Sequence, residues 1–452
     1  MLSRLDAKSQ DAIIDDLDFT TMPATQTAVL SSRNKIIRKF LFLFSKSFIS
    51  FTALHNAFLK NGPWEFILTG NSRSYLNLKK TWMVFTFKIT DAAGKPVTDT
   101  KLYAPVNNIA HSIVKNFSVH INSQLVYHNS VNYAYKSYFE NLLMYSNEQK
   151  RSTLSISGYS PDSVIDSKED SAFKTRSAWV KDGKKMQVAA NISIDLTNQP
   201  RVLLNNCNMK LTAYPNSDEF LIDNYEDSGV KYKFEIEEVY CIVNEMDLAD
   251  GLANEMETAL MEHKLFQYPL ISPQVRSFFI ESSRLDSPAT TLYTSKMPRR
   301  IFMGLVSGEA YNGHYNKSPF NFQPFDLRDV HIDYCGVTLP GRPMNLDFGN
   351  GKCVEPYLML QEALGHTRNN TSCNSISFDQ FKSKGFTIFG FELSPVPQDT
   401  NLFDLVRPTN LSIRLNFNKP TPSGGIYCIV YAEFDQIIGL DYQRNPIIDT
   451  VV

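Results

Sequence analysis

Four short sequence motifs occur twice in this chain, in the same order and roughly two hundred residues apart. The first copies are Val-His-Ile-Asn at 119–122, Tyr-Phe-Glu-Asn-Leu-Leu at 138–143, Asn-Met-Lys-Leu at 208–211 and Tyr-Cys-Ile-Val at 240–243. The second copies are Val-His-Ile-Asp at 330–333, Tyr-Leu-Met-Leu-Gln-Glu at 357–362, Asn-Leu-Ser-Ile at 410–413 and Tyr-Cys-Ile-Val at 427–430. Four matches in one order indicate an internal duplication. We therefore predict two copies of one domain in tandem, which is more typical of a structural building block than of a catalyst.

The composition indicates that each copy is rich in β-strands. The 452 residues are too many for one ordinary hydrophobic core but suit two domains of about 200 residues. The chain has 31 Phe and 21 Tyr, and aromatic rings pack well on the pleated surface of a sheet. Apolar and polar residues alternate at 114–121, as in a half-buried strand. At 133–145 the aromatic residues recur at three- and four-residue steps, which predicts a helix crossing the end of a sheet.

Strand-like segments occur about eight times in each copy, with turn residues between them and few long helices. This pattern favours an all-β fold of two tandem eight-stranded jelly rolls with short crossing helices and an inter-domain helix. An immunoglobulin-like sandwich fits less well, because neither copy has the Cys-Trp-Cys core pattern of that fold. The predicted segments are an N-terminal arm at 1–55, a first jelly roll at 56–244, a linker helix at 245–263, a second jelly roll at 264–442 and a C-terminal tail at 443–452.

The charge of the chain argues against a general affinity for nucleic acids. Its formal net charge is -2, so there is no overall positive field that would attract a polyanion. The predicted arm does contain a short basic cluster, formed by Arg33, Lys35, Arg38 and Lys39. These side chains would either contact a packaged polyanion or simply keep the arm in solvent. No run approaches the roughly 18 apolar residues that a membrane span needs.

The sequence lacks the motifs of common enzymes and cofactor sites. The glycine spacing at 308–313 resembles a phosphate-binding loop, but the Lys-Ser/Thr that should follow is absent. The eight histidines are scattered, and His120 and His331 occupy equivalent places in the two copies, which favours packing over metal binding. No Gly-x-Ser-x-Gly motif occurs, and the six cysteines form no CxxC pair, so buried free thiols are expected. Although sequence spacing does not test for a pair of glycosidase carboxylates, we predict no enzyme, no cofactor and no metal.

Three parts of the chain resemble one known family. They are 132–143, the group of segments 302–306, 310–313 and 318–322, and 430–435 together with Asp441 and Arg444. In these parts the chain resembles the double jelly-roll major capsid proteins, or hexons, of adintoviruses and of the Maverick/Polinton elements of animal genomes. Weaker agreement at 17–19, 25–26 and 62–63 extends the resemblance over nearly the whole chain. The chain departs from the family at Ala134, where Pro is usual, and at 33–52, which leaves the first strand of the first copy unassigned.

The resemblance implies a structural protein of a virion. Three subunits, each with two upright jelly rolls, would form a pseudo-hexameric trimer, and many trimers would tile an icosahedral shell around double-stranded DNA. The polar stretches 152–185 and 308–325, predicted as surface loops, would form the outward crown or the contacts between subunits. The implied partners are further copies of the chain, penton proteins and minor capsid proteins, with packaged DNA in contact only indirectly.

The implied location is the virion capsid, after synthesis in the host cytoplasm and assembly in the cytoplasm or nucleus. Two other functions stay open at this point: a jelly-roll receptor- or glycan-binding spike subunit, and a jelly-roll glycan hydrolase. The tandem duplication favours the shell protein, because a spike or a lectin rarely needs two upright copies joined by a helix.

Overall fold

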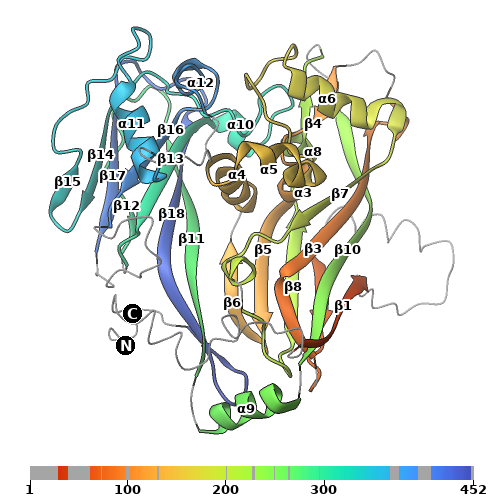
Figure 1. Cartoon of the computed structure of the whole chain (residues 1–452). Coiled ribbons are helices and arrows are strands. Elements are labelled where there is room, and N and C mark those ends of the chain that lie inside the picture. Colours follow the sequence, from red (N-terminus) through yellow and green to blue (C-terminus); the bar gives the residue numbers. More distant parts are fainter. Residues whose placement is uncertain are drawn as a thin grey trace.

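Two β-sandwiches stand side by side in the computed structural model of the chain (Figure 1). The structure describes residues 29–38, 62–72, 74–97, 102–129, 132–199, 201–226, 230–248, 250–262, 265–294, 296–366, 376–394 and 409–448. Helix α9 (Asp250–Met261) lies at the base, below both sandwiches, and connects them. We call the sandwich before α9 the first roll and the sandwich after it the second roll.

Eight strands of the first roll form two antiparallel sheets. Sheet I has the order β1-β10-β3-β7, and sheet II has the order β2-β8-β5-β6. Apolar side chains alternate along these strands and meet between the sheets, where Trp64, Phe85 and Phe87 have no exposed surface. The strands are β1 (Val29–Arg38), β2 (Trp64–Leu68), β3 (Ser74–Asp91), β5 (Val114–Ile121), β6 (Gln124–Asn129), β7 (Met186–Asn191), β8 (Met209–Pro215) and β10 (Tyr232–Leu248), with a separate short pair, β4 (Tyr103–Pro105) and β9 (Ile222–Asn224).

The second roll repeats this plan. Sheet III has the order β11-β18-β13-β16, with β19 paired to β18, and sheet IV has the order β12-β17-β14-β15. Numbered along the chain without β4, β9 and β19, the strands of both rolls follow the orders 1-8-3-6 and 2-7-4-5. This shared order confirms the predicted duplication and the predicted pair of jelly rolls. The strands are β11 (Phe266–Ile280), β12 (Thr290–Tyr293), β13 (Arg300–Ser307), β14 (Leu327–Tyr334), β15 (Val337–Leu339), β16 (Ile388–Glu392), β17 (Leu411–Phe417), β18 (Ile426–Leu440) and β19 (Pro446–Ile448).

The repeated motifs lie on equivalent strands, although one of them is out of register. His120 on β5 pairs with Lys210 on β8, and His331 on β14 pairs with Arg414 on β17. Lys210 and Arg414 are therefore equivalent, and the match between Asn208 and Asn410 is shifted by two residues. A two-residue shift keeps every side chain on the same face of a strand, so the apolar pattern survives it.

The predicted N-terminal arm contains a strand of the first roll. Residues 29–38 form β1, which pairs along β10 and takes the place that β11 has in the second roll. Arg33, Lys35 and Arg38 belong to this strand, whereas Lys39 lies outside the described residues. Charged residues are common on edge strands, which pair on one side only. The basic residues of this segment therefore led to the prediction of an arm where the chain forms a strand.

Three further elements differ from their predictions. Residues 245–248, predicted to begin the linker helix, continue β10, because 245–247 pair with β3 and Leu248 pairs with β1. Helix α9 starts only at Asp250. The stretch 152–185, predicted as a loop, contains η2 (Thr153–Ser157), α6 (Ser171–Val180) and η3 (Lys181–Gly183). The stretch 308–325 begins with the short helix α10 (Gly308–Asn312), whose first turn is capped by the Ser307 side chain.

The remaining helices are short and lie near the top of the rolls in Figure 1 or between them. Helix α4 (Tyr133–Leu143) confirms the predicted crossing helix, and α11 (Val354–Ala363) follows the same pair of strands in the second roll. Among the helices of the described ranges, none is long and apolar enough to cross a membrane. The others are α3 (Ile109–Ser112), α5 (Asn147–Arg151), α7 (Asp195–Asn198), α8 (Asp218–Leu221) and α12 (Phe378–Ser383).

Candidate functional site

Helix α4 fills the boundary between the two rolls, which we call the seam (Figure 1). All eleven residues of α4 are buried, because one side of the helix packs on β5 of the first roll and the other on β11 and β18 of the second. Tyr138 stacks on Phe320 with ring centres 4.1 Å apart, and Tyr135 stacks on Tyr311 at 5.6 Å. Each fully buried large side chain contributes about 1.5–3 kcal/mol. The seam is therefore built like a domain core and holds the rolls as one unit.

Buried polar groups in the seam are paired across it. Lys136 donates to Glu140 at 2.8 Å, and Glu140 accepts a 3.4 Å hydrogen bond from the Tyr431 hydroxyl of the second roll. Ser272 on β11 donates to Asp195 of α7 at 2.5 Å. Such pairing offsets the cost of removing charges from water and fixes the position of one roll against the other.

A second polar contact lies where α4 ends. Arg300 on β13 forms a two-point ion pair with Glu433, with N–O distances of 2.5 and 3.1 Å. The same guanidinium donates to the backbone oxygen of Ala363 at 3.0 Å and lies 3.6 Å from the sulfur of Met144, which follows α4. Arg300 therefore connects sheet III with the C-terminal ends of both α4 and α11.

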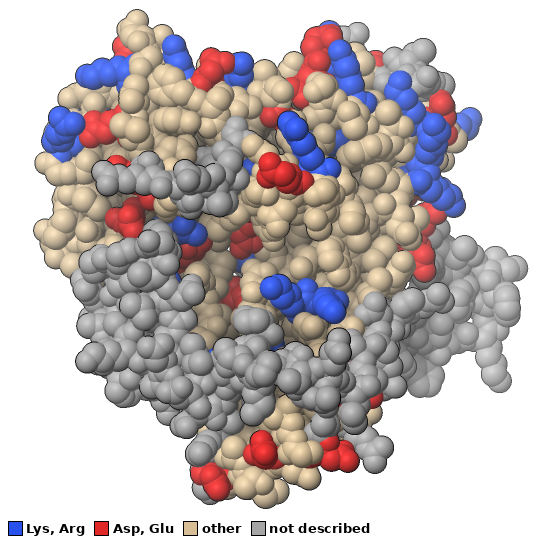
Figure 2. Space-filling model, in the orientation of Figure 1, with Lys and Arg blue, Asp and Glu red and all other residues tan. Residues whose placement is uncertain are grey.

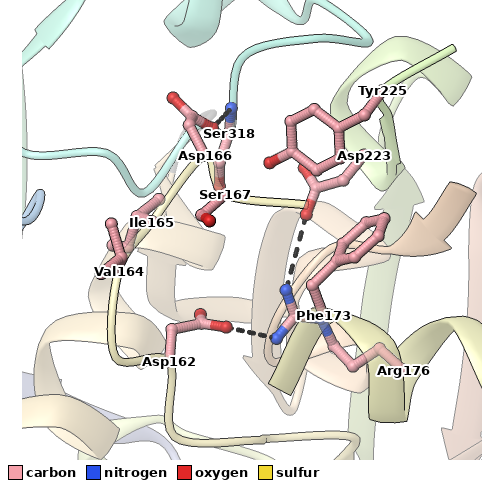
Figure 3. Close-up of a pocket in the computed structure, with 10 residues that line it drawn as sticks. All are labelled: Asp162, Val164, Ile165, Asp166, Ser167, Phe173, Arg176, Asp223, Tyr225 and Ser318. Carbon is pink, nitrogen blue, oxygen red and sulfur yellow. Dashed lines mark hydrogen bonds and ion pairs between the residues drawn. The ribbon is translucent and has the colours of Figure 1, made fainter. Parts of the chain in front are cut away.

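A small acid-lined recess lies beside α6, where the segment 162–167 of the first roll meets Ser318 of the second (Figure 3). Arg176 on α6 lies 2.6 Å from a carboxylate oxygen of Asp162 and 3.7 Å from one of Asp223 on β9. Its Nε donates to the backbone oxygen of Pro105 at 3.1 Å. Burial raises the pKa of Asp223 to about 7, because one guanidinium only partly offsets the loss of water around neighbouring carboxylates.

The segment 162–166, which we call the strap, reaches from this recess onto the second roll. The backbone N–H of Ser318 donates to Asp166 at 2.7 Å, and the Asn321 side chain also donates to Asp166. The backbone N–H of Ile165 donates to the backbone oxygen of Lys384 at 3.2 Å. Figure 3 shows Asp166 directed toward Ser318 while Asp162 points to Arg176. Arg176 thus anchors one end of the strap, and Asp166 ties the other end to the second roll.

These carboxyl groups predict that the protein is more stable at mildly acidic than at alkaline pH. The pKa is raised to about 7 for Asp223 and to about 6 for Asp195, in both cases mainly by burial. In the unfolded chain, these carboxyl groups have the ordinary Asp pKa of about 3.9. From about pH 4 to 7 the folded protein holds more protons, so the free energy of unfolding falls as the pH rises. Thermal unfolding of the wild type and of Asp223→Asn across this range measures the contribution; a wild-type stability that rose relative to the variant would contradict it.

The recess does not suit a substrate. About 10 Å³ of it is open to the centre of a water molecule, which is roughly the space that a single water needs. Small-molecule sites are usually hollows of about 300–1,000 Å³. Within the described ranges, no three His, Cys, Asp or Glu side chains lie close enough to hold a metal ion. The recess therefore provides ion pairs and hydrogen bonds but no cavity that would admit a substrate.

The cysteines and the paired histidines lie as follows. Cys207, Cys241, Cys353 and Cys428 are buried free thiols as expected, Cys335 is exposed, and Cys373 lies outside the described residues. Burial raises the pKa of Cys241 to about 12, which keeps it a thiol rather than a nucleophilic thiolate. His120 and His331 do occupy equivalent places, but both are half-exposed on the outer faces of their sheets and do not pack in a core.

The base of the molecule is held by a contact that sequence reasoning missed. Arg444, in the predicted C-terminal tail, is 7% exposed and pairs with Glu257 of α9 and with the side-chain oxygen of Asn205. The Asn122 side chain of the first roll donates to the backbone oxygen of Arg444 at 2.8 Å. Arg444 therefore joins both rolls and the linker helix, which gives a physical role to a residue noted only for its resemblance to a family.

Charge on the surface shown in Figure 2 does not mark a nucleic-acid site. Blue and red residues are interspersed over both rolls, while the base of the molecule shows red only. Helix α9 at the base contains no Lys or Arg, and its acidic residues include the exposed Asp250 and Glu255. Of the predicted basic cluster, Arg33, Lys35 and Arg38 lie together on β1. Their suggested contact with a polyanion stays a prediction.

Comparison with known proteins gives one relative by sequence. The chain is 60% identical over 438 residues to the uncharacterized protein F54H12.2 of Caenorhabditis elegans, covering 95% of this chain and all of that protein. No protein-family profile matches the chain.

Comparison with solved structures gives viral capsid proteins. The chain matches a Sputnik virophage structure with a TM-score of 0.60 and 10% identity, covering 94% of this chain and 89% of that one. It matches the mavirus major capsid protein at 0.53 and 10% identity, covering 96% and 94%. The Faustovirus major capsid protein matches at 0.53 and 7% identity, covering 91% and 90%. At these identities the likeness concerns the fold alone, and it confirms the double jelly roll.

Proposed function

Because the chain belongs to one family with the C. elegans protein F54H12.2 and has the double jelly-roll fold, we propose that it is a major capsid protein. In this proposal it assembles as pseudo-hexameric trimers that tile an icosahedral shell around double-stranded DNA. Its partners are then further copies of itself, penton proteins and minor capsid proteins, and its location is the virion, assembled in the host cytoplasm or nucleus.

The observation that carries the proposal is the rigid pairing of two duplicated rolls. Both rolls have the same strand order, and a core-like seam fixes their relative position. Two similar rolls in a fixed arrangement allow three subunits to form a ring with pseudo-hexagonal symmetry. Two rolls joined by a flexible linker would not form such a ring. The 60% identical relative from a nematode agrees with a Maverick/Polinton-type element of animal genomes, the group that the sequence motifs resemble.

The two alternatives have less support. A glycan hydrolase would need a hollow that admits a sugar between two carboxyl groups, and the acid-lined recess described above has room for about one water. A receptor- or glycan-binding spike subunit agrees with the jelly-roll fold but gives no reason for a second roll held by a buried seam. We also propose, as a secondary point, that Arg33, Lys35, Arg38 and Lys39 face the shell interior.

We expect the purified protein to form trimers. Size-exclusion chromatography with light scattering should give a mass about three times the 51.4 kDa of one chain. Electron microscopy of the protein co-expressed with its penton and minor capsid proteins should then show closed shells. A protein that stayed monomeric at all concentrations and bound glycans on an array would favour the spike subunit instead.

A further inference from the structure

The strap has one strongly held end and one weakly held end. At the first end, the carboxylate of Asp162 accepts a hydrogen bond from the guanidinium of Arg176 at 2.6 Å. At the second end, Asp166 accepts hydrogen bonds from neutral donors on the second roll, the Ser318 backbone N–H and the Asn321 amide. An ion pair with a hydrogen bond holds a buried carboxylate more firmly than neutral donors do. The Asp166 end is therefore the end that can detach.

The weakly held end packs closely on the second roll. The backbone N–H of Ile165 donates to the backbone oxygen of Lys384 at 3.2 Å. Gly385 has a φ of +89°, and a Cβ at this position would lie 2.6 Å from the Asn321 side-chain oxygen and 3.0 Å from the Cβ of Ile165. Because packed contacts of this kind do not deform continuously, the strap is either seated on the second roll or detached from it.

The recess beside the strap collects more negative than positive charge. The side chains of Asp162 and Asp223 are 8% and 6% exposed, and they share the guanidinium of Arg176, which is 4% exposed. Figure 3 shows these two carboxylates on different sides of that guanidinium and Asp166 on the same segment as Asp162. When all three carboxyl groups are ionised, their charge exceeds the single positive charge among the residues that line the recess. Such an excess is costly in a buried site.

Asp223 is the carboxyl group that keeps a proton near neutral pH. Burial raises the pKa of Asp223 to about 7; Arg176 opposes this rise, and the carboxylates of Asp166 and Asp162 add to it. Burial also raises the pKa of Asp162 and of Asp166, so the three carboxyl groups titrate in the same sense. The recess therefore holds a proton at mildly acidic pH and loses it as the pH rises toward neutrality.

The other titratable groups around the strap do not reverse this effect. Asp170, at the start of α6, accepts hydrogen bonds from the strap backbone at 2.9 and 3.0 Å. On the second roll, Lys317 pairs with Glu309 and Lys384 pairs with Asp379, so neither brings an unpaired cation to the strap. Burial raises the pKa of the neighbouring tyrosine hydroxyls above the usual value of about 10, so they stay neutral; they are Tyr138, Tyr159 and Tyr225.

We infer that the strap is a pH-dependent latch: a proton on the carboxyl groups of the recess keeps the strap seated on the second roll, and loss of this proton releases the Asp166 end. In the released state water reaches Asp223, and its pKa returns toward about 3.9. The seated state thus binds the proton more tightly and loses stability relative to the released state as the pH rises from about 4 to 7. This switch goes beyond the proposed function, and it lies within one chain.

Hydrogen–deuterium exchange followed by mass spectrometry tests the latch in the purified protein. The reporters are the peptides that contain Ile165 and Ser318, whose backbone N–H groups join the strap to the second roll. Their protection factors, which correct for faster exchange chemistry at higher pH, should fall by up to about tenfold per pH unit between about pH 5 and 7 and then level off. A peptide that contains Leu346, whose N–H donates to Arg328 within the second roll, should stay protected throughout.

Three variants show which group is responsible. Asp223→Asn keeps the shape of the side chain but cannot ionise, so both reporters should stay protected from about pH 5 to 8. Gly385→Ala adds a Cβ where Ile165 packs and should expose both reporters at every pH. Glu169→Gln changes a side chain of the same loop that is 74% exposed, so it should keep the wild-type profile.

The outcomes that overturn the latch are distinct from those that overturn the proposed function. A flat wild-type profile, or a pH dependence that survives in Asp223→Asn, contradicts the latch. Wild-type protection in Gly385→Ala contradicts it as well. Thermal unfolding checks the fold of each variant, and Asp223→Ser replaces an Asp223→Asn variant that unfolds early. The wild-type profile needs neither a variant nor an assembled shell, so a failure to form trimers would leave this result unchanged.

Discussion

Replacing Tyr138 with Ala is expected to lower the free energy of unfolding by about 3–5 kcal/mol, the range found for large-to-small changes of buried aromatic residues. The Tyr138 side chain is 1% exposed and stacks on Phe320 of the second roll, so its removal leaves a cavity in the seam. Because this cavity lies between the two rolls and weakens the contact that makes them unfold together, we also expect one thermal transition to divide into two. Differential scanning calorimetry measures both effects.

Two matched variants show whether the ring itself is responsible. Tyr138→Phe keeps the ring and removes only the hydroxyl, so it should cost about 1 kcal/mol or less. Leu358→Ala shortens a half-exposed side chain on α11, the helix in the corresponding place of the second roll, and should change stability by about 0.5 kcal/mol at most. A loss below about 1 kcal/mol for Tyr138→Ala, with a single transition, would show that the seam is not a core.

The features that the sequence predicted are those with a repeated local signal. The duplication could be predicted because equivalent strands keep similar motifs, and sheets II and IV indeed share their strand order. Helix α4 could be predicted because Tyr135, Tyr138 and Leu142 recur at helical steps. The sequence did not show that Tyr135 and Tyr138 face a second roll, because periodicity shows which face of a helix is apolar but not what covers that face.

The features that the sequence did not predict depend on contacts between distant residues. Strand β1 forms because β10 offers a free edge to a charged segment, which has no apolar alternation of its own. The strap depends on Asp166 meeting Ser318, which lies 152 residues away along the chain. Arg444 meets Glu257 across 187 residues. Single polar residues carry no periodic signal, so only the folded chain identifies their partners.

The candidate site shows the same division. Sequence reasoning proposed a basic cluster at Arg33, Lys35, Arg38 and Lys39, because consecutive charges are easy to see. The buried charges near the boundary between the rolls are instead isolated in the sequence, such as Lys136, Arg176 and Arg300, each beside an acid from another part of the chain or from the next helical turn. A buried cation in a β-rich chain is costly unless it is paired, but sequence alone does not show which of the 45 Lys and Arg residues are buried.

Replacing Arg176 with Met is expected to lower the free energy of unfolding by about 3–5 kcal/mol near neutral pH, the cost of leaving buried charges without their partner. The Arg176 side chain is 4% exposed and lies between Asp162 and Asp223. Met fills much of the same space, so the loss reports charge rather than volume. Urea unfolding followed by circular dichroism measures it.

The same helix provides the control, and pH provides a second one. Lys174 on α6 pairs with Glu169 at 2.8 Å, but the two side chains are 59% and 74% exposed, so Lys174→Met should cost far less than Arg176→Met. Lowering the pH to about 5 should recover part of the Arg176→Met loss, because neutral carboxyl groups no longer need the guanidinium. An equal loss at both pH values would mean that Arg176 acts through packing. A loss confined to neutral pH would show that Arg176 acts through its charge, by pairing with Asp162 and Asp223.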